Sequence, residues 1–351
     1  MKIKVALFSA LFFVSGLYSF SQNQIIHAKP VGAASWKYID LKGQILFESE
    51  YPLSYEFSED GVAVEYFPKK NLYIIINTKG QVIQTQLEKY EIKDAFGYAA
   101  RKFSCGLIPI KTDKHWGYMN TEGKVAIEMK YDNVQDFEDG YATARISKTF
   151  FVLDITGKET SVDDKTISDV KHFSEHLAPF TSLNRNNGFI DINGKIVIPA
   201  NFKDVGFFKN GLAWARSTEG LIGYINTKGE WVIKPQFTMA KDFDKTSGLA
   251  RVKNGEKWSY ISTTGEVINF DIADSYDDFY EGLAVGKKGG LCGFYNNKGT
   301  WVIQPQFTAV RDFKNGFAAA KQGTLWGIIN KEGKWVINPT YAGIKDVIIT
   351  K

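Results

Sequence analysis

The chain has 351 residues, of which 44% are hydrophobic, 15% aromatic and 23% charged, a composition that excludes a disordered or collagen-like protein. The 43 Lys and Arg residues exceed the 39 Asp and Glu residues by four, and they are spread evenly along the chain. So small and even an excess does not favour a nucleic-acid-binding protein, and no nucleic-acid partner is expected.

The N-terminus has the pattern of a secretory signal peptide. Lys2 and Lys4 precede an almost wholly apolar stretch, residues 5–20, and small residues stand at the two positions that a signal peptidase recognises. We expect a signal peptide over residues 1–21, cleaved after Ser21, and a mature chain that is periplasmic, on the cell surface or secreted. No membrane span is expected after cleavage, because a spanning helix needs about 20 apolar residues and no later segment supplies them.

Nine copies of one pattern fill the rest of the chain. In each copy a glycine follows an Asp, Asn or Ser by three residues, and β-forming residues flank the pair. Asx or Ser at the first position of a type I turn accepts hydrogen bonds from the turn's backbone, and Gly at the fourth adopts a left-handed conformation. The pattern predicts nine β-hairpins, with turn glycines at Gly43, Gly80, Gly123, Gly157, Gly194, Gly229, Gly265, Gly299 and Gly333.

A second phrase follows most hairpins. It runs Phe, a short polar turn, Gly, an apolar residue and Ala, as in residues 208–213 and 279–284, and it predicts a bend into a third short strand. A unit of about three strands cannot bury a core alone, so neighbouring units must stack. We predict an all-β fold of tandem β-hairpin repeats of about 36 residues, forming one domain of about nine units over residues 22–351.

Two arrangements of the repeats fit this pattern. An open, solenoid-like stack is favoured, because a four-stranded propeller blade needs about 40–50 residues. A closed, propeller-like ring is the alternative, because residues 25–28 can supply the strand that the last unit lacks. Cys105 and Cys292 lie about five units apart, too far to pair in an open stack, so a disulfide between them would favour the ring.

Two of the hairpins carry a recognisable sequence. Trp116-Gly117 and Trp326-Gly327 are each followed by two apolar residues, Asn, and a Gly-Lys pair at the turn. Together with the Phe-x-x-Gly-Leu-Ala phrase, these residues resemble the WG repeat (WG beta repeat) family over nearly the whole mature chain. The resemblance implies a bacterial protein and supplies no catalytic residues or cofactor. The Trp-Gly pair is intact only in these two units, since Lys37 and Ser259 replace the glycine after other tryptophans.

Recurring aromatic positions are expected to lie in the core. Trp231, Trp301 and Trp335 share one position, two residues after the turn glycine, where a ladder for stacking sugar rings is conceivable. Aliphatic residues fill the same position in other units, which favours the core. The same interpretation holds for a second column, formed by Tyr38, Tyr118, Phe189, Tyr224, Tyr260 and Phe294.

Departures from the repeat are the best candidates for binding. Repeat proteins place binding residues on insertions at one face, and the pattern is broken over residues 101–115 and 158–169. The candidate binding residues there are Arg101, Lys102, His115, Glu159, Asp163 and Asp164.

Motifs for metal, cofactor or catalytic chemistry are weak. His172 and His176 have the i,i+4 spacing of a ligand pair, but no third ligand completes a zinc pattern. The segment from Asp242 to Gly248 resembles a calcium loop only loosely, since its glycine is seventh rather than sixth. We expect no catalytic residue, no metal and no cofactor.

The expected function is a non-enzymatic binding or interaction scaffold, exported to the bacterial cell envelope. Its partner would be an envelope protein or a polysaccharide such as peptidoglycan. One alternative is a glycan-acting enzyme that uses Glu159, Asp163 and Asp164 of the irregular fourth unit. Another is a structural spacer, in which the repeats only set a distance.

Overall fold

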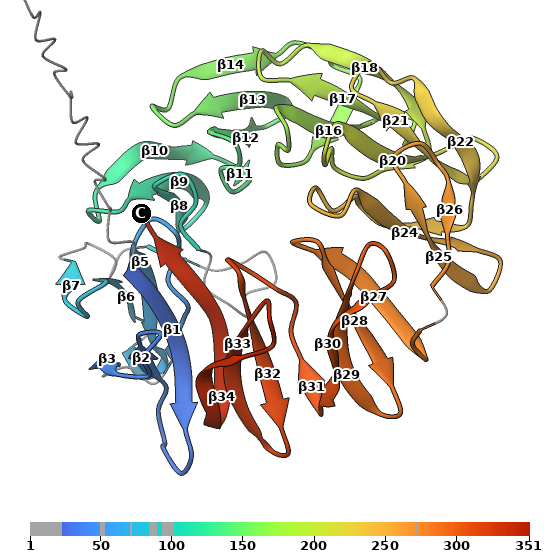
Figure 1. Cartoon of the computed structure of the whole chain (residues 1–351). Helices are drawn as coiled ribbons and strands as arrows, with labels where there is room; N and C mark the ends of the chain where they lie inside the picture. The colour runs from blue at the N-terminus through green and yellow to red at the C-terminus, as the bar shows by residue number, and fades with distance from the viewer. Residues whose placement is uncertain (1–22, 50–52, 71, 84–89, 93–101, 271) are drawn as a thin grey trace, which may run out of the picture.

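The fold is a ring of small antiparallel sheets (Figure 1). The computed structural model describes residues 23–49, 53–70, 72–83, 90–92, 102–270 and 272–351. The expected signal peptide lies outside these residues. The all-β repeat fold is confirmed, and in the described part of the chain no helix has the length and apolarity to cross a bilayer.

Each unit has up to four strand positions, and Figure 1 shows their order from the middle of the ring outwards most clearly in the sheet from β11 to β14. The first strands are β4 (Leu53–Ser54), β11 (Asn133–Val134), β15 (Ile167–Val170), β19 (Asp204–Val205), β23 (Met239–Ala240), β27 (Ser275–Tyr280) and β31 (Ala309–Val310). The second strands are β1 (Asn23–Pro30), β5 (Val62–Phe67), β8 (Leu107–Thr112), β12 (Tyr141–Ile146), β16 (Leu177–Ser182), β20 (Leu212–Arg216), β24 (Leu249–Asn254), β28 (Leu283–Lys288) and β32 (Phe317–Gln322).

The third and fourth strands form the predicted hairpins, on the outer side of each sheet. The third strands are β2 (Lys37–Ile39), β6 (Leu72–Asn77), β9 (His115–Asn120), β13 (Thr149–Asp154), β17 (Asn187–Asp191), β21 (Ile222–Asn226), β25 (Lys257–Ser262), β29 (Leu291–Asn296) and β33 (Leu325–Asn330). The fourth strands are β3 (Ile45–Glu48), β7 (Val82–Ile83), β10 (Val125–Tyr131), β14 (Glu159–Val162), β18 (Ile196–Phe202), β22 (Trp231–Phe237), β26 (Val267–Ile268), β30 (Trp301–Phe307) and β34 (Trp335–Thr350). One 3₁₀ turn, η1 (Pro68–Lys70), follows β5.

All nine predicted hairpin turns are present, and the reason is the predicted one. In the sixth unit the backbone N–H of Gly229 donates to the carbonyl of Asn226 over 2.9 Å. The Asn226 side-chain oxygen accepts the N–H groups of Lys228 and Glu230 over 3.0 and 3.1 Å. The nine turn glycines have φ between 71° and 88°, a conformation that glycine adopts without strain.

The ring closes by strand pairing between the two ends of the described chain. β34 is long enough to serve twice: its first half is the fourth strand of the last unit, and its second half pairs with β1 from Asn23↔Thr350 to Pro30↔Tyr341. One sheet therefore has the order β3-β2-β1-β34-β33-β32-β31. The favoured open stack is wrong, and the closed alternative holds, with residues 25–28 in the closing strand. Closure needs no disulfide, since Cys105 and Cys292 are both free thiols.

The predicted column of core aromatics lies between successive units. Its six members are at most 3% exposed. Where the residue is tyrosine, its hydroxyl reaches 17 residues along the chain to a backbone carbonyl of the following unit, as from Tyr224 to Lys241 over 2.7 Å. Equivalent bonds run from Tyr38 to the carbonyl of Tyr55 and from Tyr118 to the carbonyl of Gln135. Burial of the rings and these hydrogen bonds join the units into one body.

The tryptophan column is half-buried rather than buried, which corrects the expectation of a core position. Aliphatic residues at the same position are more than one third exposed, including Ile45 at 53% and Val267 at 51%. Trp231 packs edge-on against Phe202 of the preceding unit, with ring centroids 5.4 Å apart. Trp335 packs in the same way on Phe307 at 5.5 Å, so these tryptophans seal the outer side of a unit boundary.

The glycine of the Trp-Gly pair makes room for the fourth strand. A Cβ at Gly223 would lie 2.2 Å from the carbonyl oxygen of Ile233, and a Cβ at Gly117 would lie 2.4 Å from that of Ile127. Each of the five units with this glycine has a fourth strand of at least seven residues. In contrast, the fourth strands of the units with Lys37, Phe151 and Ser259 at that position have two or four residues.

Candidate functional site

One side chain from every unit stands at the inner end of its sheet. Each is the residue directly before the buried Phe of the Phe–Gly phrase, or before Val347 in the closing unit. The following residue is buried in every unit, whereas each of these residues is exposed or half-buried. These residues, termed the inner ring, are Glu56, Lys102, Asp136, His172, Phe207, Asp242, Asp278, Asp312 and Asp346.

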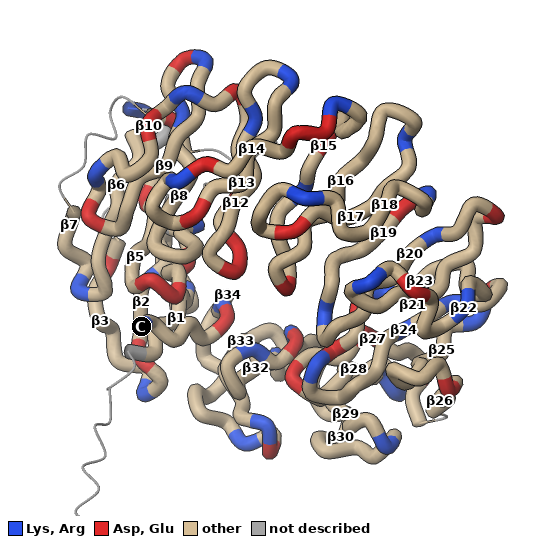
Figure 2. Tube along the Cα trace, turned by 90° about the horizontal axis from the view of Figure 1, so that it is seen from above, with Lys and Arg blue, Asp and Glu red and all other residues tan. Residues whose placement is uncertain are grey.

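Contacts link neighbouring members of the inner ring. The Lys102 ammonium lies 3.1 Å from one carboxylate oxygen of Glu56, and the Lys345 ammonium lies 3.8 Å from the other. The guanidinium of Arg311 lies 3.7 Å from Asp346. Farther round, His172 stacks on Phe207 with ring centroids 3.9 Å apart. In Figure 2, acidic segments border the middle of the ring, seen from above.

Two carboxyl groups on the acidic side of the inner ring have raised pKa values. Partial burial, with the nearby carboxylates of Asp277, Asp278 and Asp346, raises the pKa of Asp312 to about 6. Burial also raises the pKa of Asp242, against the opposing effect of nearby lysines. Repulsion of this kind is relieved when a positive group approaches.

On the opposite side of the inner ring, lysines of the chain itself balance the charge of Glu56. Burial alone would raise the pKa of Glu56, but the charges of Lys102 and Lys345 and the hydrogen bond from Lys102 outweigh it and lower the pKa. The inner ring therefore has a sector around Glu56, where cations lower the pKa of the carboxyl, and an acidic sector from Asp242 to Asp346, where the pKa values of Asp242 and Asp312 are raised.

Two adjacent recesses lie in the acidic sector. One, of about 490 Å³, is lined by Asp242, Asp278 and lysines of neighbouring bends. The other, of about 550 Å³, is lined by Asp312, Asp346 and Arg311 among others. Tyr280, 46% exposed, borders both recesses. A tyrosine face beside carboxylates can receive a cation by both charge and cation–π attraction.

The structure separates the candidate residues of the first irregular segment. Lys102 belongs to the inner ring, whereas Arg101 lies outside the described residues. His115 begins β9, and its ring nitrogen lies 3.9 Å from Asp132. The six residues of β8 separate Lys102 from His115, a rise of about 20 Å. These two residues therefore lie at opposite ends of their sheet.

The acidic candidates of the fourth unit are engaged in local contacts. The Glu159 carboxylate accepts a hydrogen bond from the Tyr131 hydroxyl and lies 2.7 Å from the Lys130 ammonium. Asp163 accepts from the hydroxyl of Ser161, and Asp164 accepts from the backbone and hydroxyl of Thr166. Among the described residues, no hydrogen bond or ion pair joins Lys102, His115, Glu159, Asp163 or Asp164 to another of these five.

The remaining motifs fall on ordinary bends. His176 is in a turn with φ of 62°, while His172 is held in the inner ring. Asp244 accepts the N–H groups of Ser247 and Gly282, as expected of a turn residue. Within the ranges that the structure describes, no three His, Cys, Asp or Glu side chains are grouped to hold a metal ion.

Sequence reasoning missed the inner ring, although its signal is present. The Phe of the Phe–Gly phrase is present in eight of the nine bends, and the residue before it is Asp in four units and Glu in one. Judged one unit at a time, these carboxylates are ordinary turn residues. Only closure of the ring brings them together.

Known structures resemble this fold. A crystal structure titled as the eukaryotic initiation factor aligns over 92% of this chain and 98% of its own, with 11% identity and a TM-score of 0.55, which shows a shared fold and nothing more. The crystal structure of BamB from Moraxella catarrhalis aligns over 83% and 87%, with 11% identity and a TM-score of 0.37. No curated protein matches the sequence.

A family model agrees with the repeats described above. The model described as WG containing repeat matches five segments, residues 116–149, 188–219, 222–258, 293–324 and 326–347. The matched segments cover all five units with the Gly that admits a long fourth strand. Five of its repeats therefore match the WG beta repeat family, and the described units close into a propeller-like ring.

Proposed function

We propose that this chain is an exported, non-enzymatic binding scaffold of the bacterial cell envelope, and that the acidic sector of its inner ring holds a positively charged partner. The observation that carries the proposal is the pKa of Asp312, raised to about 6 by partial burial and by three other carboxylates around an open recess. A lysine or arginine of a partner placed there would relieve repulsion that the folded chain otherwise bears.

The contacts of the fourth unit support a binding scaffold over the glycan-acting enzyme. A general acid in glycoside hydrolysis needs a raised pKa. For Glu159, the hydrogen bonds and charge from Lys130 and Tyr131 overcome the effect of burial and lower the pKa. Asp164 is likewise held as a carboxylate by Thr166, whose hydrogen bonds lower its pKa. These side chains are suited to bracing turns.

The ring shape supports a scaffold over a spacer. A spacer requires only that units follow one another, and its length grows with their number. Closure through β1 and β34 fixes the number of units and gathers one side chain from each around a shared centre. A binding surface benefits from such convergence, because several weak contacts act on one partner at once.

The test is affinity capture from envelope extracts with the protein lacking residues 1–21, read by mass spectrometry. We expect a partner with a basic surface, retained at low salt and released at high salt. The double variant Asp242→Asn, Asp312→Asn should lose it. The control Asp163→Asn, which changes an exposed carboxylate of another unit, should retain it. Equal capture by both variants would contradict the assignment of the acidic sector.

Export has its own test. Expression of the full chain in a bacterium, followed by fractionation and intact-mass measurement, should yield a protein that begins at Gln22 and lies outside the cytoplasm. A cytoplasmic protein that keeps residues 1–21 would contradict this part of the proposal.

A further inference from the structure

The seventh unit has a gap where other units have a long fourth strand. In the flanking units, Ile222 pairs with Phe237 and Cys292 pairs with Phe307, at the ends of seven-residue strands. β26 has only two residues, and the equivalent of Ile222 and Cys292 is Trp258. Among the described residues no fourth strand covers Trp258, because β26 pairs only with Tyr260 and Ile261, so the outer side of β25 is open at Trp258.

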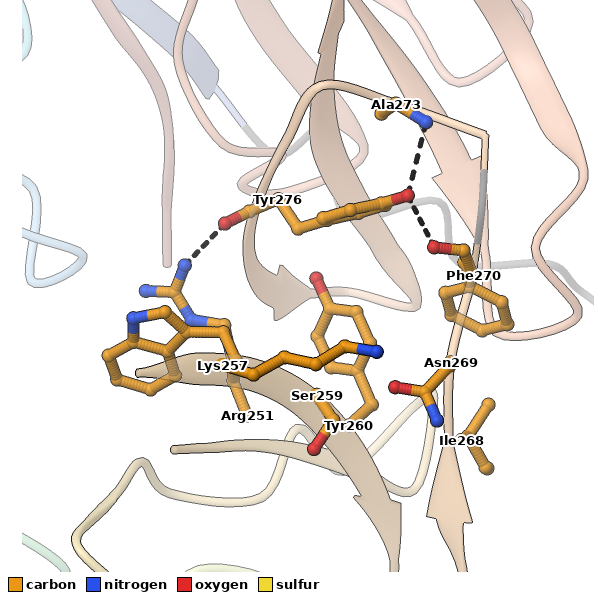
Figure 3. A pocket seen from close by; sticks show the side chains of 10 residues that line it. Arg251, Lys257, Ser259, Tyr260, Ile268, Asn269, Phe270, Ala273 and Tyr276 are labelled. Carbon is orange, nitrogen blue, oxygen red and sulfur yellow. Dashed lines mark hydrogen bonds between the residues drawn. The ribbon is translucent and has the colours of Figure 1, made fainter. Parts of the chain in front are cut away.

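The opening is a pocket of about 430 Å³ (Figure 3), within the size range of small-molecule sites. Its aromatic lining comes from Trp258, Tyr260, Phe270 and Tyr276. Its polar lining comes from Arg251, Lys257, Ser259 and Asn269, which are labelled in Figure 3.

The walls of this pocket are held in place before any ligand binds. The Tyr276 hydroxyl accepts the N–H groups of Ile272 and Ala273 over 3.1 Å and donates to the carbonyl of Phe270. Figure 3 shows the last two of these bonds, which join Ala273 and Phe270 to Tyr276. Residues held by such hydrogen bonds lose little further freedom on binding.

Arg251 is also held in place, and its guanidinium is paired with a carboxylate of the chain itself. Its guanidinium lies 2.6 Å from a carboxylate oxygen of Asp278 and 4.5 Å from the centre of the Trp258 ring. It also donates a hydrogen bond to the carbonyl of Tyr276. Arg251 therefore braces the pocket and connects it to Asp278 of the inner ring.

The remaining polar groups of the pocket are available. Lys257 and Asn269 are exposed, and within the described chain neither side chain has a hydrogen bond or ion pair with another residue. Figure 3 shows Lys257 extended across the pocket towards the side on which Asn269 lies. The pocket thus offers an ammonium group, an amide and the hydroxyl of Ser259 beside aromatic surface.

We propose that this pocket binds an acidic sugar, a pyranose that carries a carboxylate. The ammonium of Lys257 pairs with the carboxylate, and the amide of Asn269 and the hydroxyl of Ser259 bond the ring hydroxyls. The apolar face of the pyranose packs on Trp258 and Phe270. A carboxylate side chain of a peptide would pair with the Lys257 ammonium. It would leave the amide and the hydroxyl without hydrogen-bond partners and the aromatic surface uncovered.

The experiment is calorimetric titration of the full mature chain with glucuronate, with glucose as the neutral analogue and N-acetylglutamate as a carboxylate without a sugar ring. We expect saturable binding of glucuronate that Lys257→Gln weakens by about tenfold or more. Lys228→Gln, a matched change on an exposed lysine of the sixth unit, should leave it unchanged. Asp312→Asn should also leave it unchanged, which separates this site from the inner ring.

Three results would overturn the proposal. One is the absence of saturable glucuronate binding to wild type, and another is equal affinity of wild type and Lys257→Gln. The third is binding of N-acetylglutamate as tight as that of glucuronate, which would make the pocket a general carboxylate or peptide site. Because Lys257 is exposed and makes no contact that holds the fold together, its replacement is not expected to unfold the protein.

Discussion

Glu65 of β5 provides the sharpest prediction about stability. This carboxyl is 0% exposed and accepts hydrogen bonds from the hydroxyls of Ser49 over 2.5 Å and Tyr38 over 3.0 Å. Burial raises its pKa to about 7 from 4.5, and the two hydrogen bonds only partly offset that effect. The perturbation is Glu65→Gln, which keeps the shape and an acceptor oxygen but cannot ionise.

The magnitude follows from proton linkage. A carboxyl with a pKa of about 7 when folded and 4.5 when unfolded binds more protons in the folded state between these two values. Ionisation of this carboxyl lowers the free energy of unfolding. The loss is nil below about pH 4, grows as the pH rises, and is complete above about pH 7. Ionisation of Glu65 therefore costs the fold about 3 kcal/mol at high pH, of which about 2.5 kcal/mol develops between about pH 5 and pH 8.

The assay is urea unfolding of wild type and Glu65→Gln across that pH range. The variant should gain about 2.5 kcal/mol relative to wild type from about pH 5 to pH 8, whatever its difference at the lower pH. Glu59→Gln, a change of an exposed carboxylate close in the chain, is the control. A pH-independent difference for Glu65→Gln, or the same trend in the control, would refute burial as the cause.

Two further substitutions test how units and turns are stabilised. Tyr224→Phe should lower the free energy of unfolding by about 1–2 kcal/mol, because it leaves the carbonyl of Lys241 without its buried donor; an unchanged urea midpoint would show that water replaces the hydroxyl. Gly229→Ala should cost about 1–2 kcal/mol more than Gly220→Ala, since both have positive φ but only at Gly229 would the new Cβ meet a neighbour, Ile198 at 2.8 Å. Equal losses in thermal unfolding would mean that backbone strain alone sets the cost.

Local chemistry made the repeated unit predictable. An Asx or Ser three residues before a glycine is enough to define the turn, because all the hydrogen bonds lie within five residues, as from Asn226 to Glu230. The aromatic column was also predictable, because every unit must fill the same space against its neighbour. The tryptophan column was misjudged because interchange with aliphatic residues does not distinguish a half-covered boundary from a buried core.

Closure of the ring could not be predicted in the same way. It depends on pairing between Asn23 and Thr350, residues at the two ends of the chain that no local pattern connects. The period of the repeat was a poor guide, because the fourth strand of one unit continues almost directly into the first strand of the next, as from Phe237 to Met239. Because these connections are so short, four strands fit into a unit of about 36 residues.

One candidate site depends on closure of the ring, and the other depends on a serine that stands where other units have glycine. The inner ring exists only once the units are arranged about a centre, so its carboxylates were read as separate turn residues. The pocket of the seventh unit has a sequence signal in Ser259, which replaces the glycine that a long fourth strand requires. The sequence alone does not show that this glycine contacts the fourth strand, so the effect of Ser259 could not be predicted.

The central claim is that the acidic sector of the inner ring binds a cationic partner. The most direct measurement is calorimetric titration of the mature chain with oligolysine at about pH 5 and about pH 8. Because Asp312 loses its proton near pH 6, affinity should rise between these values, binding at intermediate pH should release protons, and Asp312→Asn should remove most of the rise. Affinity that is equal at both pH values, or that is unchanged by Asp312→Asn, would contradict the claim.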